Sequence, residues 1–398
     1  MTSKRIRHHR LAKFATVFVS ILVGLALSEV GLRLVESSRL GDRKVTLVPD
    51  PLLGIRVPPF ASGHDSNGFR NDNVPIQADI VALGDSQTWG VNVQRADAWP
   101  QQLAKLSGRR VYNMGVGAYG PVQYWALTDK ALSFSPRVII VALYQGNDFY
   151  DAYHVAYTNE NYRDLRAADA PPELKEDVTE RASQTYWDEE KEFHNNFGRS
   201  SLSGWSLWLR EHSAIGRLLN RIGWWPGAAD VDYLIDREWA HAHPDHGANY
   251  DQGNIRTVFT TAYRLTTLDS NDPRIREGLR ITKEMLVRIQ QKAAAVGART
   301  LVLVVPTKEL VYADLMKREN LDNGAYALLI AKEMHDRDEM LSFCVNEKIQ
   351  CADALPPLRA AIERGEQIYP ASTESHPNAH GYTLLAAVAN KAIQELSW

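Results

Sequence analysis

Apolar and polar positions along the chain form blocks that predict strands alternating with helices. Apolar runs occupy 80–83, 137–143 and 300–305, and their only charged residue is Arg137 at the start of the second run, as is typical of parallel strands that are covered on both faces. Weaker strand patterns lie at 110–113 and 349–352. Helical spacing of apolar residues follows at 99–106, 124–134, 275–296, 326–346 and 382–396. This alternation predicts an α/β fold, in which a parallel sheet has helices on both faces.

Two stretches depart from this pattern. Residues 36–77 contain several prolines and no sustained periodicity, which predicts a linker leading into a domain that spans 78–398. The interval 150–272 breaks the alternation and is too long for a plain connection, so we expect an insertion or a lid there.

The insertion is rich in tryptophan. Six of the ten tryptophans of the chain lie in it: Trp187, Trp205, Trp208, Trp224, Trp225 and Trp239. A basic amphipathic segment at 207–221 carries Arg210, Arg217 and Arg221 beside leucines and an isoleucine. Three interpretations stay open: aromatic side chains that line a substrate cleft, a helix that rests on a membrane surface, or a small secondary core.

The N-terminus has a charge pattern of its own. Basic residues at 4–13 precede an uncharged apolar run at 14–27, which predicts a cytoplasmic flank and a signal anchor over 1–35, with everything beyond it exported. Fourteen residues of helix reach only about 21 Å of a ~30 Å hydrocarbon core, so a signal peptide cleaved near 26–28 is the alternative. The apolar pattern resumes at 30–35, and Glu29 and Arg33 can reach the interface, so we prefer the uncleaved anchor. In a bacterium the exported domain would lie in the periplasm.

Composition narrows the function classes. The chain has 398 residues, 44% of them hydrophobic, and a net charge of -3, without the basic stripe expected of a nucleic-acid partner. Cys344 and Cys351 are its only cysteines, which is too few for a zinc ligand set without clustered histidines. They suit a local disulfide in an oxidising compartment, and two buried free thiols are the alternative.

Four segments carry candidate chemistry. Gly84-Asp85-Ser86 ends the first strand of the domain, and ligands bind beyond the carboxyl ends of such strands. A glycine-rich loop at 113–123 allows backbone N–H groups to face a cleft. Asn147 follows the strand at 137–143 and offers an amide to a developing oxyanion. His376 stands in a loop before the last helix, where it can act as a general base. Each segment alone is common in turns and loops.

In this order and at these strand ends, the four segments together resemble the four blocks of the SGNH (GDSL-type) hydrolase superfamily. The resemblance covers roughly 78–148 and 298–398 and leaves the insertion unexplained. It implies a flavodoxin-like three-layer α/β/α domain that hydrolyses esters through an acyl-enzyme, without a metal or an organic cofactor.

The resemblance also implies roles for single residues. Ser86 would be the nucleophile, with its backbone N–H as one oxyanion donor, His376 the base, and the Asn147 side chain a second oxyanion donor. The acid of the family lies three residues before the histidine, where this chain has Thr373. Glu374 is the nearest carboxylate. We therefore predict a Ser86-His376-Glu374 triad, with a Ser-His dyad as the alternative.

The third oxyanion donor in such a fold is a backbone N–H of the glycine-rich loop. The family glycine aligns with Ala118, and Gly115 and Gly117 lie beside it. The donor is thus predicted only to within a residue or two.

Three function classes remain. The preferred one is an exported, membrane-anchored esterase acting on an extracytoplasmic glycan or lipid ester. The second is an O-acyltransferase, in which a sugar hydroxyl of an envelope polysaccharide replaces water as the acceptor. The third is a catalytically silent binding module, which the presence of Ser86, Asn147 and His376 disfavours. The residues identify neither the acyl group nor a protein partner.

Overall fold

The computed structural model describes residues 2–40, 45–170, 174, 193, 212–221, 231–322 and 324–396. The chain divides into two compact units. The larger unit contains 42–194 and 232–398, and the smaller one contains 1–41 and 195–231.

Five described strands of the larger unit form one parallel sheet. They are β3 (Ile80–Leu83), β4 (Val111–Asn113), β5 (Val138–Tyr144), β8 (Arg299–Val305) and β9 (Gln350–Asp353). The spatial order is β4-β3-β5-β8-β9. The predicted strands and the parallel α/β architecture are confirmed.

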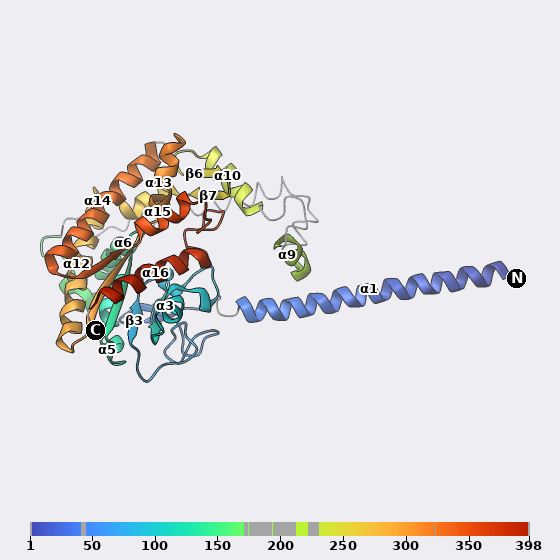
Figure 1. Cartoon of the computed structure of the whole chain (residues 1–398), viewed down its shortest axis with the longest axis horizontal. Coiled ribbons are helices and arrows are strands. Elements are labelled where there is room, and N and C mark those ends of the chain that lie inside the picture. Colours follow the sequence, from blue (N-terminus) through green and yellow to red (C-terminus); the bar gives the residue numbers. More distant parts are fainter. Residues whose placement is uncertain are drawn as a thin grey trace. The chain divides into compact units, whose positions relative to one another are not determined.

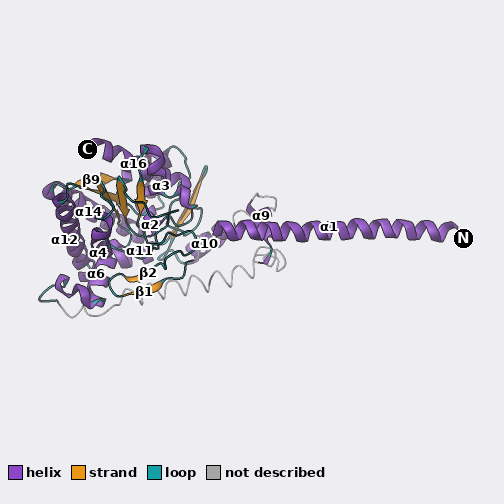
Figure 2. Cartoon of the chain, turned by 90° about the horizontal axis from the view of Figure 1, so that it is seen from below, coloured by secondary structure: helices purple, strands orange, loops and turns teal. Residues whose placement is uncertain are grey.

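Helices cover both faces of this sheet, because the pleat sends alternate side chains to opposite sides. The even-numbered residues of β5 from 138 to 144 pack with α3 (Trp99–Ser107), α13 (Lys308–Arg318), α15 (Leu355–Glu363) and α16 (Ala379–Glu395). Its odd-numbered residues from 139 to 143 pack with α4 (Pro121–Ala126), α12 (Pro273–Ala295) and α14 (Gly324–Glu347). Figure 2 shows the sheet between these two layers, an arrangement of three layers.

Parts of the expected insertion belong to the main fold. Helix α6 (Asp148–Thr158) packs along α12, and α11 (Thr261–Leu268) packs along α14. In the sequence, α6 and α11 are separated by elements that include the 3-10 helix η2 (Glu160–Leu165), α10 (Val231–Ala242) and an antiparallel hairpin of β6 (Ala248–Gln252) and β7 (Ile255–Phe259). Trp239 is buried with Tyr233 and Val258 in a small core of its own, and the other five tryptophans of this interval lie outside the described residues.

The stretch expected to be a linker is largely packed against the domain. Strands β1 (Val48–Asp50) and β2 (Gly54–Arg56) form a hairpin, and Phe69 is buried in the core. The guanidinium of Arg70 is buried and donates to the carbonyl oxygens of Gly90 and Val93 at 2.6 and 2.9 Å. This stretch is held by single side chains and polar contacts, which leave no periodic apolar pattern in the sequence.

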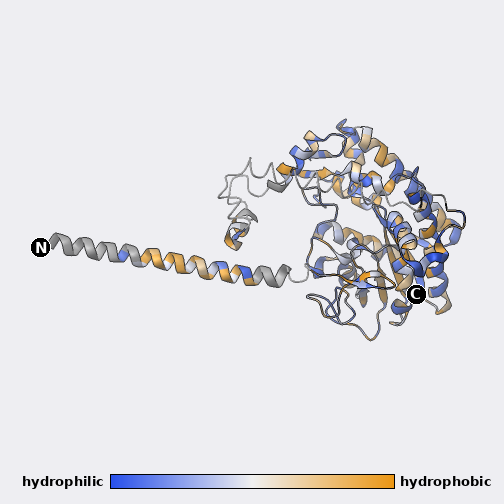
Figure 3. Cartoon of the chain, turned by 180° about the vertical axis from the view of Figure 1, so that it is seen from behind, coloured by the Kyte–Doolittle hydropathy of each residue, from blue (hydrophilic) through white to orange (hydrophobic). Residues whose placement is uncertain are grey.

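The smaller unit contains α1 (Thr2–Leu40) and α9 (Ala214–Arg221). Within α1, Thr16–Leu34 is long and apolar enough to cross a membrane. Figure 3 shows most of this stretch in the hydrophobic colour, with a few hydrophilic residues toward its C-terminal end, and its large apolar side chains are exposed. Figure 1 shows that α1 runs as one continuous helix, so it extends beyond the expected limit at residue 35.

Cys344, near the end of α14, is joined by a disulfide to Cys351 on β9, with their Cα atoms 6.1 Å apart. The bond fastens the edge strand of the sheet to the helix that precedes it. Free thiols, the alternative left open by the sequence, are absent because both cysteines of the chain are paired.

Candidate active site

Strand β3 delivers Ser86 to the carboxyl edge of the sheet through a tight turn. A Cβ atom on Gly84 would lie 2.1 Å from the Thr88 hydroxyl oxygen, so the turn leaves no room for a side chain there. The buried Asp85 accepts the backbone N–H of Gln87 at 2.8 Å and thereby caps the short helix α2 (Ser86–Trp89). Ser86 is the first residue of that helix and remains partly exposed.

A hydrogen-bonded chain joins Ser86 to two residues that are far away in the sequence. His376 Nε2 lies 2.8 Å from Ser86 Oγ, and His376 Nδ1 lies 2.5 Å from Glu374 Oε1. Because a carboxylate at Nδ1 favours the tautomer with its proton on that nitrogen, Nε2 is left to accept the serine hydroxyl proton. The Ser86 hydroxyl also lies 3.2 Å from Asp85 Oδ2, which offers it a second acceptor.

Glu374 is ionised at neutral pH. Burial raises the pKa of its carboxyl, but the hydrogen bond from the His376 ring, the attraction of that ring's charge and the hydrogen bond from the His376 backbone N–H outweigh burial and hold the pKa at about 2. The neighbouring Thr373 has its backbone N–H bonded to Asp236 of α10 at 2.7 Å. The structure therefore brings Glu374, and not the residue at 373, to the histidine.

Asn147 lies at the start of α6 and lines the same cavity as Ser86. Its side-chain nitrogen donates to Asp151 Oδ2 at 2.7 Å. An amide nitrogen carries two N–H bonds, so one remains for a group in the cavity. Burial and the charge of Asp85 raise the pKa of Asp151 well above its ordinary value, against the opposing hydrogen bond from Asn147.

In the glycine-rich loop, the third oxyanion donor can be the backbone N–H of Gly117 or of Ala118. The Gly115 N–H is bonded to Asn113 Oδ1 at 2.9 Å, so it cannot serve an oxyanion, contrary to one of the predicted registers. A Cβ atom built on Gly117 would lie 3.8 Å from Ser86 Cβ. The N–H groups of Gly117 and Ala118 bond to none of the described residues, and Ala118 has a φ of 65°.

A cavity of about 370 Å³ opens over these groups. Its wall includes Ser86, Asn147, Glu374 and His376 from the predicted set. It also includes Tyr144, Thr260, Tyr263, Arg264, Ser372, Thr373 and Ser375. The expected insertion thus contributes directly to the site, through residues at 260–264.

Lys308 holds the loop that contains Glu374 and His376. Its buried ammonium group donates to the carbonyl oxygens of Val258, Ser372 and Glu374 at 2.6, 2.9 and 3.1 Å. Burial lowers the pKa of Lys308 to about 8, against the raising effect of Glu309 and Glu374. Nothing in the sequence marks this residue, because a lysine after a strand is normally exposed.

Arg264 is a second buried cation that the sequence did not reveal. Its Nη1 donates to the carbonyl oxygen of Gly146 at 3.3 Å, and the Thr267 hydroxyl donates to the same oxygen at 2.7 Å. Its Nε lies 3.9 Å from the buried carboxylate of Glu309. These contacts fix the turn that presents Asn147.

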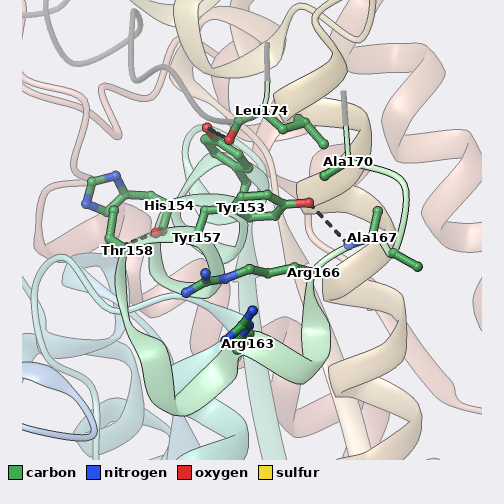
Figure 4. Close-up of a pocket in the computed structure, with 10 residues that line it drawn as sticks. Tyr153, His154, Tyr157, Thr158, Arg163, Arg166, Ala167, Ala170 and Leu174 are labelled. Carbon is green, nitrogen blue, oxygen red and sulfur yellow. Dashed lines mark hydrogen bonds between the residues drawn. The ribbon is translucent and has the colours of Figure 1, made fainter. Parts of the chain in front are cut away.

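A second cavity, of about 520 Å³, lies along α6 and η2 (Figure 4). Tyr153, Tyr157, Arg163 and Arg166 are part of its wall. The Tyr157 hydroxyl accepts the backbone N–H of Ala167 at 3.2 Å. None of the predicted site residues lines this cavity.

No family model and no curated protein matches the chain. Among solved structures, it is similar to a protein assigned to the lipolytic G-D-S-L family from Desulfitobacterium hafniense, with 12% identity, 79% of this chain and 98% of that chain covered, and a TM-score of 0.37. A lipolytic G-D-S-L family member from Veillonella parvula matches with 12% identity, coverages of 80% and 98%, and a TM-score of 0.35. A variant of an acetyl-xylooligosaccharide esterase from Geobacillus matches with 9% identity, coverages of 82% and 98%, and a TM-score of 0.36. The chain is thus similar to GDSL-type lipolytic proteins and esterases, at identities that leave the roles of its residues to its own geometry.

Proposed function

We propose that the protein is a serine ester hydrolase of the SGNH type, anchored in a membrane by α1, that acts through an acyl-enzyme on an ester-bearing glycan or lipid outside the cytoplasm. The observation that carries the proposal is the chain of hydrogen bonds from Ser86 through His376 to Glu374 at the wall of a cavity. A serine hydroxyl without an adjacent base is a weak nucleophile, and a histidine held by a carboxylate is a usual means of activating it.

The first half of the reaction forms the acyl-enzyme. Ser86 Oγ attacks the ester carbonyl carbon while its proton moves to His376 Nε2, and the carbonyl oxygen becomes an oxyanion. The ionised Glu374 stabilises the imidazolium that results. The Asn147 side chain and the backbone N–H groups of Ser86 and Gly117 are the proposed donors to the oxyanion.

The second half releases the product. The tetrahedral intermediate collapses as His376 gives its proton to the departing alkoxide, which leaves as an alcohol and leaves the acyl group on Ser86. A water molecule then attacks the acyl carbon with His376 as the base. The acid leaves and the Ser86 hydroxyl is restored.

The test combines covalent labelling with turnover in the full-length protein. A fluorophosphonate should add one mass increment to the wild type, located by peptide mapping at Ser86, and none to Ser86→Ala. Turnover of p-nitrophenyl acetate should fall by about 10⁴-fold or more in Ser86→Ala, in His376→Ala and in the double variant alike, because the pair acts as a unit. Ser133→Ala, at an exposed surface serine, is the matched control.

Unchanged turnover in Ser86→Ala would refute the assignment of the protein as a serine ester hydrolase with Ser86 as its nucleophile. Product analysis on acetylated glycans and acylated lipids then identifies the acceptor. Release of free acid supports a hydrolase. Acyl groups newly attached to a glycan hydroxyl would instead identify the protein as an O-acyltransferase.

A further inference from the structure

Glu29 is an acidic residue inside the apolar stretch of α1, and it makes a set of contacts that explains its presence there. Its carboxylate accepts the Ser213 hydroxyl at 2.9 Å and the backbone N–H groups of Ala214 and Ile215 at 2.8 and 3.0 Å. Arg33, one turn further along α1, donates to the same carboxylate at 2.8 Å. Four donors therefore surround one carboxylate.

These contacts complete the N-terminus of α9. The first N–H groups of a helix have no partner within it. The Ala214 and Ile215 N–H groups are bonded to Glu29, and the next one, of Gly216, is bonded to the Ser213 hydroxyl at 3.1 Å. Arg33 also donates to the backbone carbonyl oxygen of His212 at 2.5 Å. The start of α9 is thus capped by a side chain of α1.

The position of Glu29 sets the depth of this junction. Glu29 lies five residues before Leu34, the end of the apolar stretch, which is about 7–8 Å along a helix axis. Amphipathic helices that lie on membranes are buried about 5–10 Å into the boundary between headgroups and acyl chains. The basic flank precedes the apolar stretch, so this end is the extracytoplasmic one.

The sequence of α9 suits that depth. Ile215, Leu218 and Leu219 are spaced so that they share one face of the helix, and Leu218 is 36% exposed. The eight residues also include two arginines, which favour anionic lipid headgroups.

We propose that α9 is an interfacial helix, latched to the membrane anchor by Glu29 and Arg33, whose apolar face enters the outer lipid surface. The proposal rests on α1 being the membrane anchor and is independent of the esterase assignment. It gives the carboxylate of Glu29 a structural reason, because an unpaired charge at this depth is costly and a fully bonded one is far less so. It also makes the segment between α6 and α10 a second point at which the chain reaches the membrane.

The first experiment asks whether α9 meets lipid. Both native cysteines are in a disulfide, so Leu218→Cys in the full-length protein can be labelled at one position with an NBD fluorophore. In nanodiscs of phosphatidylcholine and phosphatidylglycerol, the label should emit at a blue-shifted wavelength and be quenched several-fold more by headgroup nitroxide lipids than the same label at Val296→Cys, a position 67% exposed on the larger unit. Water-like emission and equal quenching at the two positions would overturn the proposal.

The second experiment tests the latch. Glu29→Leu keeps the apolar stretch but removes all four contacts, and it should reduce quenching at position 218 at least to half, whereas Val30→Leu, a neighbouring exposed position, should leave quenching unchanged. Equal quenching in Glu29→Leu and the wild type would refute the latch. Hydrogen exchange in the wild type provides a test without a variant: the Ala214 and Ile215 amides should be protected, and rapid exchange at both would equally refute it.

Discussion

Glu374 and His376 are separated by one residue, so a single short loop holds both the proposed base and the group that orients it. The backbone N–H of His376 also bonds to Glu374 at 3.0 Å, which fixes the carboxylate from the same side. The Glu374 side chain turns back past the single intervening residue, so that Oε1 lies 2.5 Å from Nδ1 of the ring. The acid could be predicted only as the nearest carboxylate, because spacing alone does not report how a loop curls.

The variant Glu374→Gln tests this arrangement. It removes the negative charge but keeps a similar shape, so turnover of a small activated ester should fall roughly 10²- to 10⁴-fold with little change in KM, because the carboxylate acts mainly on the imidazolium of the transition state. Glu366→Gln, at a partly exposed glutamate that contacts Arg364 and His380 outside the cavity, is the matched control. Steady-state kinetics of the two variants decide the point, and unchanged turnover in Glu374→Gln would support a Ser-His dyad.

Asn147 allows a second test at the level of one side chain. Asn147→Ala removes a proposed oxyanion donor and should reduce kcat by about 10²- to 10³-fold. KM should change little, since the donor acts on charge that develops only after attack. Labelling by a fluorophosphonate reports whether the variant retains a reactive Ser86. A variant with full kcat would exclude the side chain from the oxyanion site.

At the scale of elements, the predicted strands correspond to the observed ones because parallel strands buried on both faces must be apolar throughout. Helix α13 escaped prediction because it begins with Lys308 and Glu309, which are charged yet buried. The β6–β7 hairpin escaped prediction for a different reason, since exposed polar residues such as Asp251 and Arg256 interrupt its apolar pattern. Polar groups that are buried through specific partners carry no periodic signal, so no sequence pattern marks Lys308 and Arg264 as neighbours of the site.

The glycine-rich loop yields a prediction about packing. A Cβ atom on Gly115 would lie 2.6 Å from the Trp89 backbone nitrogen and 2.7 Å from Thr88 Cβ, so Gly115→Ala should destabilise the protein by about 1–3 kcal/mol through overpacking. Gly117→Ala meets only an ordinary contact, at 3.8 Å from Ser86 Cβ, and should unfold like the wild type. Urea unfolding of both variants makes the comparison, and equal midpoints would contradict it.

At the scale of the whole molecule, buried carboxyl groups link stability to pH. Burial raises the pKa of Glu333 from 4.5 to about 7, although hydrogen bonds from the Thr307 hydroxyl and N–H lower it. Burial likewise raises the pKa of Asp336 from 3.8 to about 7. Between the unfolded and the folded pKa, the native state holds a proton that the unfolded chain has lost. The stabilisation from each group is therefore fully present below its unfolded pKa and disappears as the pH rises through about 7.

The variant Glu333→Gln stays neutral at every pH and should flatten this dependence. The wild type should lose up to roughly 3 kcal/mol from this group between about pH 5 and about pH 8, and the variant should not. Asp336→Asn should remove a further part of the slope. Denaturant unfolding of the full-length protein at both pH values measures the free energy of unfolding. A parallel decline of this free energy in the wild type and both variants would show that other groups control the pH dependence.

Ser86 and His376 lie 290 positions apart in the chain. This separation governs when the proposed site can be complete. A ribosome supplies the serine early and the base almost last, and domains fold as their segments emerge. If the proposed anchor directs export during synthesis, the proposed nucleophile crosses the membrane before the proposed base has been made. On the proposed mechanism, a product of premature termination before residue 376 lacks the base, and we expect it to be inert toward esters.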